Sequence, residues 1–204
     1  MLVKISGFNE MNEAHIPKDL ADPVFRKATA NMMAAYLVCK KALSHFTAEE
    51  KKSFALIVST QFGEVSSSLD FLTTYYDLQI AKPILFQNSL HNSTLGFITI
   101  QLGLTGPALT LSADERMDEA INETARGLLS LVSHVLVCQV DIVPDFVKEN
   151  YAVAYPHLKN HLGWARAFVI SQNDATLAAN SIDTDLSKFI YSQSLGELLG
   201  AARV

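Results

Sequence analysis

Two neighbouring carboxylates are the residues of this chain best placed to do chemistry. Asp114 and Glu115 directly follow the short apolar run Ala108–Ala113, a pattern that predicts a strand delivering them to the first turn of a helix. Unpaired backbone N–H groups and the helix dipole favour negative charge at that position. The sequence therefore predicts either ordinary charges that stabilise a first helical turn, or a carboxylate that takes part in binding or acid–base chemistry.

Histidine and cysteine provide the other candidates for a reactive or metal-binding site. His157 and His161 are four residues apart, a spacing that can place two metal ligands on one helix face. The glutamate of the metalloprotease helix motif does not follow His157, and no third ligand is evident, so we expect no metal site. Cys39 and Cys138 each lie inside an apolar segment, which predicts reduced thiols in the core rather than a disulfide.

Composition limits the classes of partner. The chain has 204 residues, of which 49% are hydrophobic and 18% charged, enough to bury a substantial core. Its net charge of -5, without a long run of lysine or arginine, excludes the electrostatic surface that nucleic acid or an anionic membrane requires. Polar residues interrupt the longest apolar stretches, such as Leu128–Val140, so we expect no membrane span. The first residues hold no secretory signal, which predicts a cytoplasmic protein.

The elements that must position these residues alternate along the chain. Short apolar runs typical of buried strands occupy Leu2–Ile5, Phe54–Thr60, Ala108–Ala113, Val135–Val140 and Trp164–Ile170. Amphipathic stripes predict helices from Asp22 to about His45, over Val65–Asp77, after a loop at Pro83–Asn88 as far as Gly103, and from Asp114 onward. This order predicts an α/β fold, with a five-stranded, mixed but mainly parallel sheet and helices on both faces. Residues 1–180 would form one domain, and 181–204 a tail that docks as a helix.

Several segments together resemble the β-ketoacyl synthase family. The resemblance is carried by FQNSLHN at Phe86–Asn92, by Gly96, by GLTGP at Gly103–Pro107 and by Thr110–Ser112, in that order and spacing. It implies a thiolase-like half-domain that covers roughly Leu2 to Gln172 and corresponds to the family's N-terminal half. In the family, the strand after Gly-Pro leads to a nucleophilic cysteine six positions into a pattern that begins here at Thr110. Glu115 stands in that position.

The replacement of the nucleophile changes the expected chemistry. Acyl transfer in the family needs a thiolate, and a carboxylate would give only a mixed anhydride that hydrolyses. The resemblance also implies that the catalytic histidines and lysine come from a C-terminal half that this sequence does not match. It implies that His91 packs beside the nucleophile helix and transfers no proton, so we expect a buried, hydrogen-bonded histidine. The binding residues expected at this site are Asn88, His91, Asn92, Ser112, Asp114 and Glu115.

Three functions remain open from the sequence. The chain is expected to be a non-catalytic subunit of fatty-acid or polyketide biosynthesis similar to a chain-length factor, a residual acyl-thioester decarboxylase or hydrolase that uses Glu115, or a plain protein-interaction domain. No cofactor is expected. The expected partner is a second copy or a longer ketoacyl synthase subunit, together with an acyl carrier protein. The resemblance places the contact at Leu109, Thr110 and Leu111, an edge strand without a charge or proline to protect it.

Overall fold

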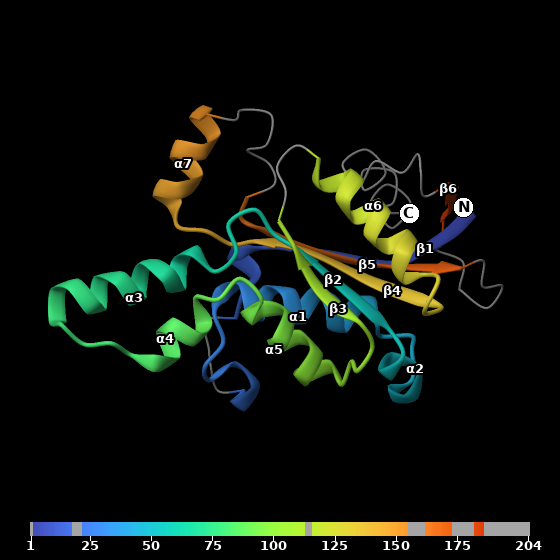
Figure 1. The fold of residues 1–204 in the computed structure, drawn as a ribbon, viewed down its shortest axis with the longest axis horizontal. Coiled ribbons are helices and arrows are strands. Elements are labelled where there is room, and N and C mark those ends of the chain that lie inside the picture. Colours follow the sequence, from blue (N-terminus) through green and yellow to red (C-terminus); the bar gives the residue numbers. More distant parts are fainter. Residues whose placement is uncertain (1, 18–21, 113–115, 155–161, 173–181, 186–204) are drawn as a thin grey trace.

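A single mixed β-sheet forms the centre of the molecule (Figure 1). The computed structural model describes residues 2–17, 22–112, 116–154, 162–172 and 182–185. Its strands are β1 (Leu2–Asn12), β2 (Ala55–Ser59), β3 (Ala108–Leu111), β4 (His134–Asp141), β5 (Trp164–Gln172) and β6 (Ile182–Asp185). They lie in the order β3-β2-β4-β5-β1-β6, so β3 is an edge strand.

Helices cover both faces of this sheet. They are α1 (Ala30–Ala42), α2 (Ala48–Lys52), α3 (Val65–Leu78), α4 (Pro83–Asn88), α5 (Ser93–Leu102), α6 (Met117–Leu128) and α7 (Asp145–Ala154). Figure 1 shows α1 and α5 on one face and α6 on the other, while α3 and α4 extend away from the sheet. In the part of the chain that the structure describes, no helix is both long and apolar enough to cross a membrane.

The burial of β2, the strand next to the β3 edge, explains why its sequence is apolar without alternation. All five of its residues are buried. Leu56 and Val58 belong to the core beneath α1, whereas Ala55 and Ile57 belong to the core beneath α6. A strand covered on both faces gains from an apolar residue at every position.

The predicted mixed sheet with helices on both faces is confirmed, and all five predicted strands are present. Two details differ. Within the described residues, β2 pairs in parallel with β3 and β4, but the β4–β5, β5–β1 and β1–β6 ladders are antiparallel. Parallel pairing therefore does not predominate, because apolar runs report burial and not strand direction. The strand β6 is additional: it falls in the tail for which a helix was expected, and the rest of residues 181–204 lies outside the described residues.

Three helix boundaries also differ from the predictions. The stretch from Asp22 to His45 contains a 3₁₀ turn at Pro23–Phe25 and then α1, which begins after Thr29 because that side chain caps the Met32 N–H. Pro83–Asn88, expected to be a loop, is the helix α4 with its proline at the first position. The helix expected from Asp114 is described from Met117. The helix α7 was not predicted.

Gly106, in the Gly-Pro motif, lies against the backbone of Ser53 and Phe54, directly before β2. A Cβ atom on it would be 2.3 Å from the Phe54 carbonyl oxygen, which is backbone and cannot move aside without disturbing β2. We expect Gly106→Ala to lower the free energy of unfolding by about 2 kcal/mol or more. Chemical denaturation of purified protein measures this, with Gly127→Ala as the control because a Cβ there meets nothing within 4 Å. Equal effects of the two substitutions would contradict the assignment.

Candidate functional site

The candidate site lies where the parallel strands β2, β3 and β4 end. Ligands of open α/β sheets bind outside the carboxyl ends of such strands. Thr60 follows β2 and donates its backbone N–H to the Leu111 carbonyl oxygen at 3.0 Å. Ser112 comes directly after β3, and Asp141 is the last residue of β4. The chain therefore brings the ends of three strands to one edge of the sheet.

A buried carboxylate holds the turn after β2. Asp141 Oδ1 accepts hydrogen bonds from the Thr60 hydroxyl at 2.7 Å and from the N–H groups of Gln61 and Phe62 at 3.0 Å each. The Thr60 hydroxyl in turn accepts the Gly63 N–H at 2.8 Å. Burial raises the pKa of Asp141 to about 6, against these hydrogen bonds, which lower it. Asp141 thus fixes the turn from Thr60 to Gly63 to the end of β4.

Glu64, at the end of the same turn, is a second buried carboxylate. It is 3% exposed, and its Oε1 accepts hydrogen bonds from the hydroxyls of Thr29, at 3.0 Å, and Thr94. Burial raises the pKa of Glu64, and the two hydroxyls oppose that rise. Thr29 precedes α1 and Thr94 lies in α5. Glu64 therefore ties the turn to both helices on that face of the sheet.

Two further polar side chains complete the support of this turn. Asn31 donates to the Gly63 carbonyl oxygen and accepts the Ile142 N–H, both at 2.7 Å, so it joins the segments that follow β2 and β4. From α7, the Tyr151 hydroxyl donates to Gln61 Oε1 at 2.7 Å, and its ring packs edge-on against a neighbouring aromatic ring. These donors and acceptors are largely satisfied by one another, which makes the turn a rigid element.

His91 differs from its prediction. It was expected to be buried and hydrogen-bonded, but it is exposed in the turn between α4 and α5. Its ring lies against Gly63, where an added Cβ would be 2.4 Å from His91 Nδ1. Gly63 also has a positive φ of 55°, so both its conformation and its contact with His91 favour glycine. The reason for the exposure is that α4 and its connection to α5 extend away from the sheet instead of covering it.

The structure brings only some of the predicted site residues together. Asn88 and Asn92 line an open depression of about 460 Å³ between α4 and α5, and the Asn88 side chain donates to the Lys27 carbonyl oxygen at 3.1 Å. Ser112 is exposed at the end of β3. The remaining candidates lie outside the described residues, namely Asp114, Glu115, His157 and His161.

Sequence reasoning missed the buried carboxylate network. Asp141 follows a predicted strand by one residue and Glu64 ends the Gln61–Glu64 turn, so a signal existed in their positions. Acidic residues directly beside a buried strand are uncommon unless they are hydrogen-bonded. Among the described residues, no group of three or more histidine, cysteine, aspartate or glutamate side chains could hold a metal ion. The network can hold the backbone of the turn in place. Its two carboxylates already accept hydrogen bonds from residues of this chain.

Both thiols lie inside the protein, as expected. Cys39 in α1 and Cys138 in β4 are each 0% exposed. Burial raises the pKa of Cys39 well above its ordinary value, and the neighbouring Cys138 adds to the rise. A thiol becomes a nucleophile as its thiolate, so this environment disfavours acyl transfer at Cys39.

Comparison with known proteins identifies the family of this fold. The family described as "Beta-ketoacyl synthase, N-terminal domain" matches residues 30–195, whereas a search of curated proteins finds no match. A chain of the ketosynthase (ApeO) in complex with its chain length factor (ApeC) from Xenorhabdus doucetiae superposes with a TM-score of 0.64 at 15% identity, over 86% of this chain and 81% of that one.

Two other solved structures share the fold. The ishigamide ketosynthase/chain length factor gives a TM-score of 0.64 at 16% identity, over 79% of this chain and 48% of that chain. A type II polyketide synthase acyl-carrier protein in complex with its ketosynthase bound to the hexaketide, AntDE:AntF, gives 0.60 at 11% identity, over 84% of this chain and 62% of that chain. The present chain therefore spans less than two thirds of these two relatives.

Proposed function

Because the chain belongs to the family of β-ketoacyl synthase N-terminal domains, we propose that it is a ketosynthase-like subunit that forms no acyl-enzyme itself. It would act by association in fatty-acid or polyketide biosynthesis that uses an acyl carrier protein. The observation that carries this proposal is Glu115 at the position of the family's nucleophilic cysteine. A carboxylate there cannot hold a growing chain as a thioester.

The environment of the two cysteines supports the proposal. Neither Cys39 nor Cys138 is accessible to a substrate, and the raised pKa of Cys39 disfavours its thiolate. The chain therefore offers no accessible thiol that could replace the missing nucleophile. The solved relatives include complexes of a ketosynthase with a chain length factor, which supports a role as the partner of an active ketosynthase.

The proposed contact with a partner is the free edge of β3. Among the described residues, β3 pairs only with β2 and ends the sheet, so one side of Leu109, Thr110 and Leu111 has no neighbouring strand there. Backbone donors and acceptors of an edge strand can pair with a strand of another chain. A strand added there would extend the sheet across the interface.

Incubation with acyl and malonyl thioesters tests the proposed function. We expect intact-mass measurement to show no covalent adduct, because both thiols are buried and Glu115 forms no stable acyl group. We also expect no release of carbon dioxide from malonyl-acyl carrier protein above that of the substrate alone. An adduct on Cys39 or Cys138 would overturn the proposal. Turnover of the malonyl thioester that disappears in Glu115→Gln would instead establish a residual enzyme.

Association is tested separately, by co-purification with a ketosynthase encoded in the same genome. Retention of that ketosynthase by the tagged chain, and its loss in Leu109→Lys, would support the β3 contact. Lysine in the middle of a paired edge strand places a charge against the partner strand. Leu131→Lys is the matched control, since Leu131 is 73% exposed and lies after α6.

A further inference from the structure

The helix α7 lies outside the core of the protein. None of its ten residues is buried, whereas Ile142 and Val143, shortly before it, are 7% and 4% exposed. The chain therefore leaves the core at Pro144, and the helix follows outside it. Figure 1 shows α7 apart from α1, α5 and α6, the helices that cover the sheet.

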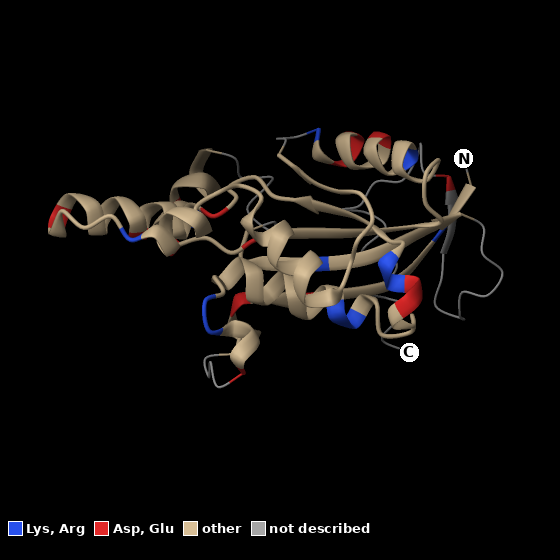
Figure 2. Ribbon diagram, turned by 60° about the horizontal axis from the view of Figure 1, so that its bottom comes forward, with Lys and Arg blue, Asp and Glu red and all other residues tan. Residues whose placement is uncertain are grey.

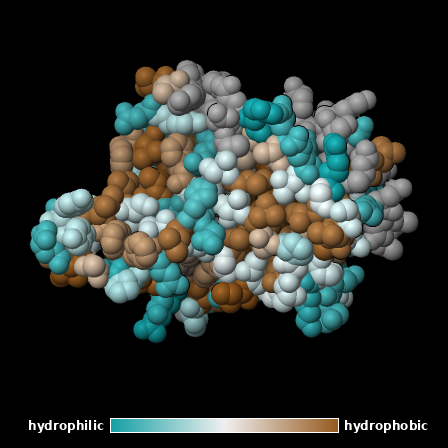
Figure 3. Space-filling view, viewed as in Figure 1, coloured by the Kyte–Doolittle hydropathy of each residue, from teal (hydrophilic) through white to brown (hydrophobic). Residues whose placement is uncertain are grey.

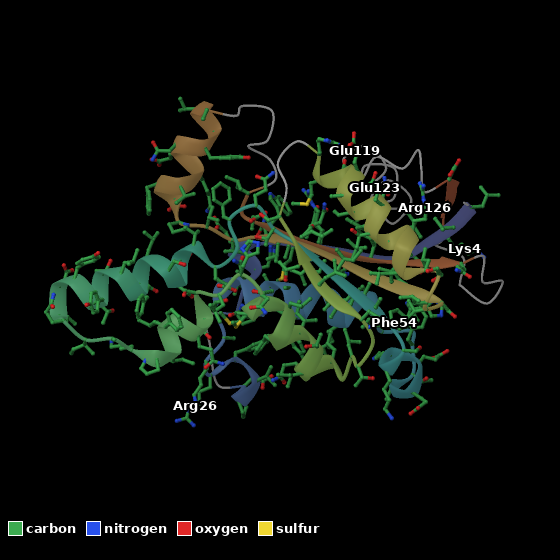
Figure 4. All side chains as sticks on the ribbon, in the orientation of Figure 1. Lys4, Arg26, Phe54, Glu119, Glu123 and Arg126 are labelled. Atoms are coloured by element: carbon green, nitrogen blue, oxygen red, sulfur yellow. The ribbon has the colours of Figure 1, made fainter. Side chains whose placement is uncertain are left out.

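The helix α6 shows how a packed surface helix of this chain differs from α7. Figure 2 shows charged residues along α6, and Figure 4 shows Glu119, Glu123 and Arg126 pointing outward from it. Ile121 and Ala125 on the same helix are 0% exposed and belong to the core. The helix thus has a polar outer face and an apolar inner face, and burial of the inner face holds it to the sheet.

The large apolar side chains of α7 provide no such attachment. Phe146 is 53% exposed and Val153 is 83% exposed. Their separation of seven positions places both on one side of the helix, and Figure 3 shows apolar surface where α7 lies in Figure 1. A segment with few buried apolar contacts opens locally with less free energy than the core requires. The helix α7 therefore belongs to the least stable part of the fold.

Polar side chains attach α7 to the rest of the chain at two points. Lys148 Nζ donates to Glu13 Oε1 at 2.6 Å. The Tyr151 hydroxyl donates to Gln61 Oε1 at 2.7 Å, and the Tyr151 ring packs edge-on against Phe62 with the ring centroids 5.0 Å apart. The side chains of Lys148 and Glu13 are 22% and 45% exposed, so water and salt weaken this ion pair.

Both attachment points are themselves fixed to the end of β4. Glu13 donates its N–H to the Gly163 carbonyl oxygen at 3.0 Å, and Gly163 donates its N–H to the Asp141 carbonyl oxygen at 2.8 Å. Gln61 donates its N–H to Asp141 Oδ1 at 3.0 Å. Because these hydrogen bonds involve no residue of α7, the attachment points stay in place when the helix leaves them.

We propose that α7 is a hinged cover of the turn after β2. It opens about Pro144 when the contacts of Lys148 and Tyr151 break, and the sheet stays folded. Opening exposes the Gln61 side chain and the Phe62 ring at the edge where the parallel strands end. Access to this part of the edge is thereby controlled by α7. The inference does not depend on the proposed function.

Native-state hydrogen exchange of the full chain, measured by mass spectrometry at increasing urea concentration, tests the cover. A detached ten-residue helix is marginal in water, so opening also releases its backbone amides. We expect the amides of residues 149–154 to be at least about 100-fold less protected than those of α1, a helix with eight buried residues. Urea below the unfolding midpoint should speed exchange in α1 and leave α7 nearly unchanged, because local opening exposes little surface.

Two variants and a matched control connect the opening to the named contacts. Lys148→Met and Tyr151→Phe should each speed exchange of residues 149–154 about threefold and leave α1 unchanged. Lys52→Met is the control, because Lys52 makes an exposed ion pair with Glu49 at 2.7 Å, in α2. It should leave exchange in α7 unchanged.

Four results would overturn the inference. Protection and urea dependence of α7 equal to those of α1 would mean that α7 opens only when the whole chain unfolds. Faster exchange throughout the chain in the Lys148 and Tyr151 variants would likewise indicate global destabilisation. Unchanged exchange of α7 in both variants would show that these contacts do not hold it closed. Faster exchange of α7 in the Lys52 variant would show that the effect is not specific. The wild-type urea series stands as a test even where a variant fails to fold.

Discussion

Asp141→Ala is expected to lower the free energy of unfolding by about 3 kcal/mol at neutral pH. The substitution leaves the Thr60 hydroxyl and the N–H groups of Gln61 and Phe62 without their acceptor. Each buried donor without a partner costs about 1–3 kcal/mol, and the removal of a buried charge offsets part of that sum. Chemical denaturation followed by circular dichroism measures the difference.

A matched aspartate separates the loss of the network from the loss of an aspartate in general. Asp77, near the end of α3, is exposed, and its replacement by alanine should change the free energy of unfolding by less than about 0.5 kcal/mol. The Asp141 variant should also show faster hydrogen exchange at the N–H groups of residues 61–63. Equal stability of the two variants would show that the turn after β2 does not depend on Asp141.

The strands could be predicted because their cause is local. Leu56–Val58 lies between two covering layers, and a continuous apolar run records that burial directly. The strand β6 carries no comparable signal, since Asp183 and Asp185 alternate with Ile182 and Thr184 in a short polar segment. It forms because it pairs with β1, far away in the sequence. Backbone hydrogen bonds between two strands do not require particular side chains, so the sequence of β6 does not indicate the pairing.

The buried network could not be predicted as a network for the same reason. Asp141 and Thr60 are 81 positions apart and meet because Ser59 pairs with Gln139 in the parallel ladder. The register of β2 against β4 decides that Thr60 and Asp141 lie beside each other at the ends of the two strands. No pattern within either strand specifies that register. The family motif could be recognised because its residues are close together in the sequence. Its Gly106 is needed because the backbone at this position lies close to the Phe54 carbonyl oxygen.

The helices α3 and α4 show a third limit of sequence reasoning. Pro83–Asn88 was expected to be a loop that precedes a helix, yet Pro83 is favourable at the first position of a helix, where its missing N–H would be unpaired in any case. Exposure of Phe86 and Tyr76 was likewise not visible, because an apolar stripe predicts a buried helix face. Here the stripe is present but its own chain does not cover it.

The stability of the chain is expected to fall as the pH rises from about 4 to about 6, in part because of Asp141. Burial raises its pKa from 3.8 to about 6 in the folded protein. Between these values the unfolded chain has released this proton and the folded chain retains it, so rising pH favours unfolding. Well above pH ~6, Asp141 is ionised in both the folded and the unfolded chain, and its contribution to stability no longer changes with pH. The difference between the two pKa values corresponds to about 3 kcal/mol.

Asp141→Asn tests this dependence, because an amide keeps an acceptor oxygen for the turn and does not titrate. Relative to this variant, the wild-type free energy of unfolding should decrease by about 2 kcal/mol between pH ~4 and pH ~7, because part of the full difference lies below pH ~4. Glu64, whose pKa burial also raises, contributes with the same sign in both proteins and cancels in the comparison. Urea denaturation of the two proteins across this range gives the difference directly. A difference that stays constant would mean that the three donors stabilise the Asp141 carboxylate as much as burial destabilises it, and one that grows in favour of the wild type as the pH rises would mean that they stabilise it more.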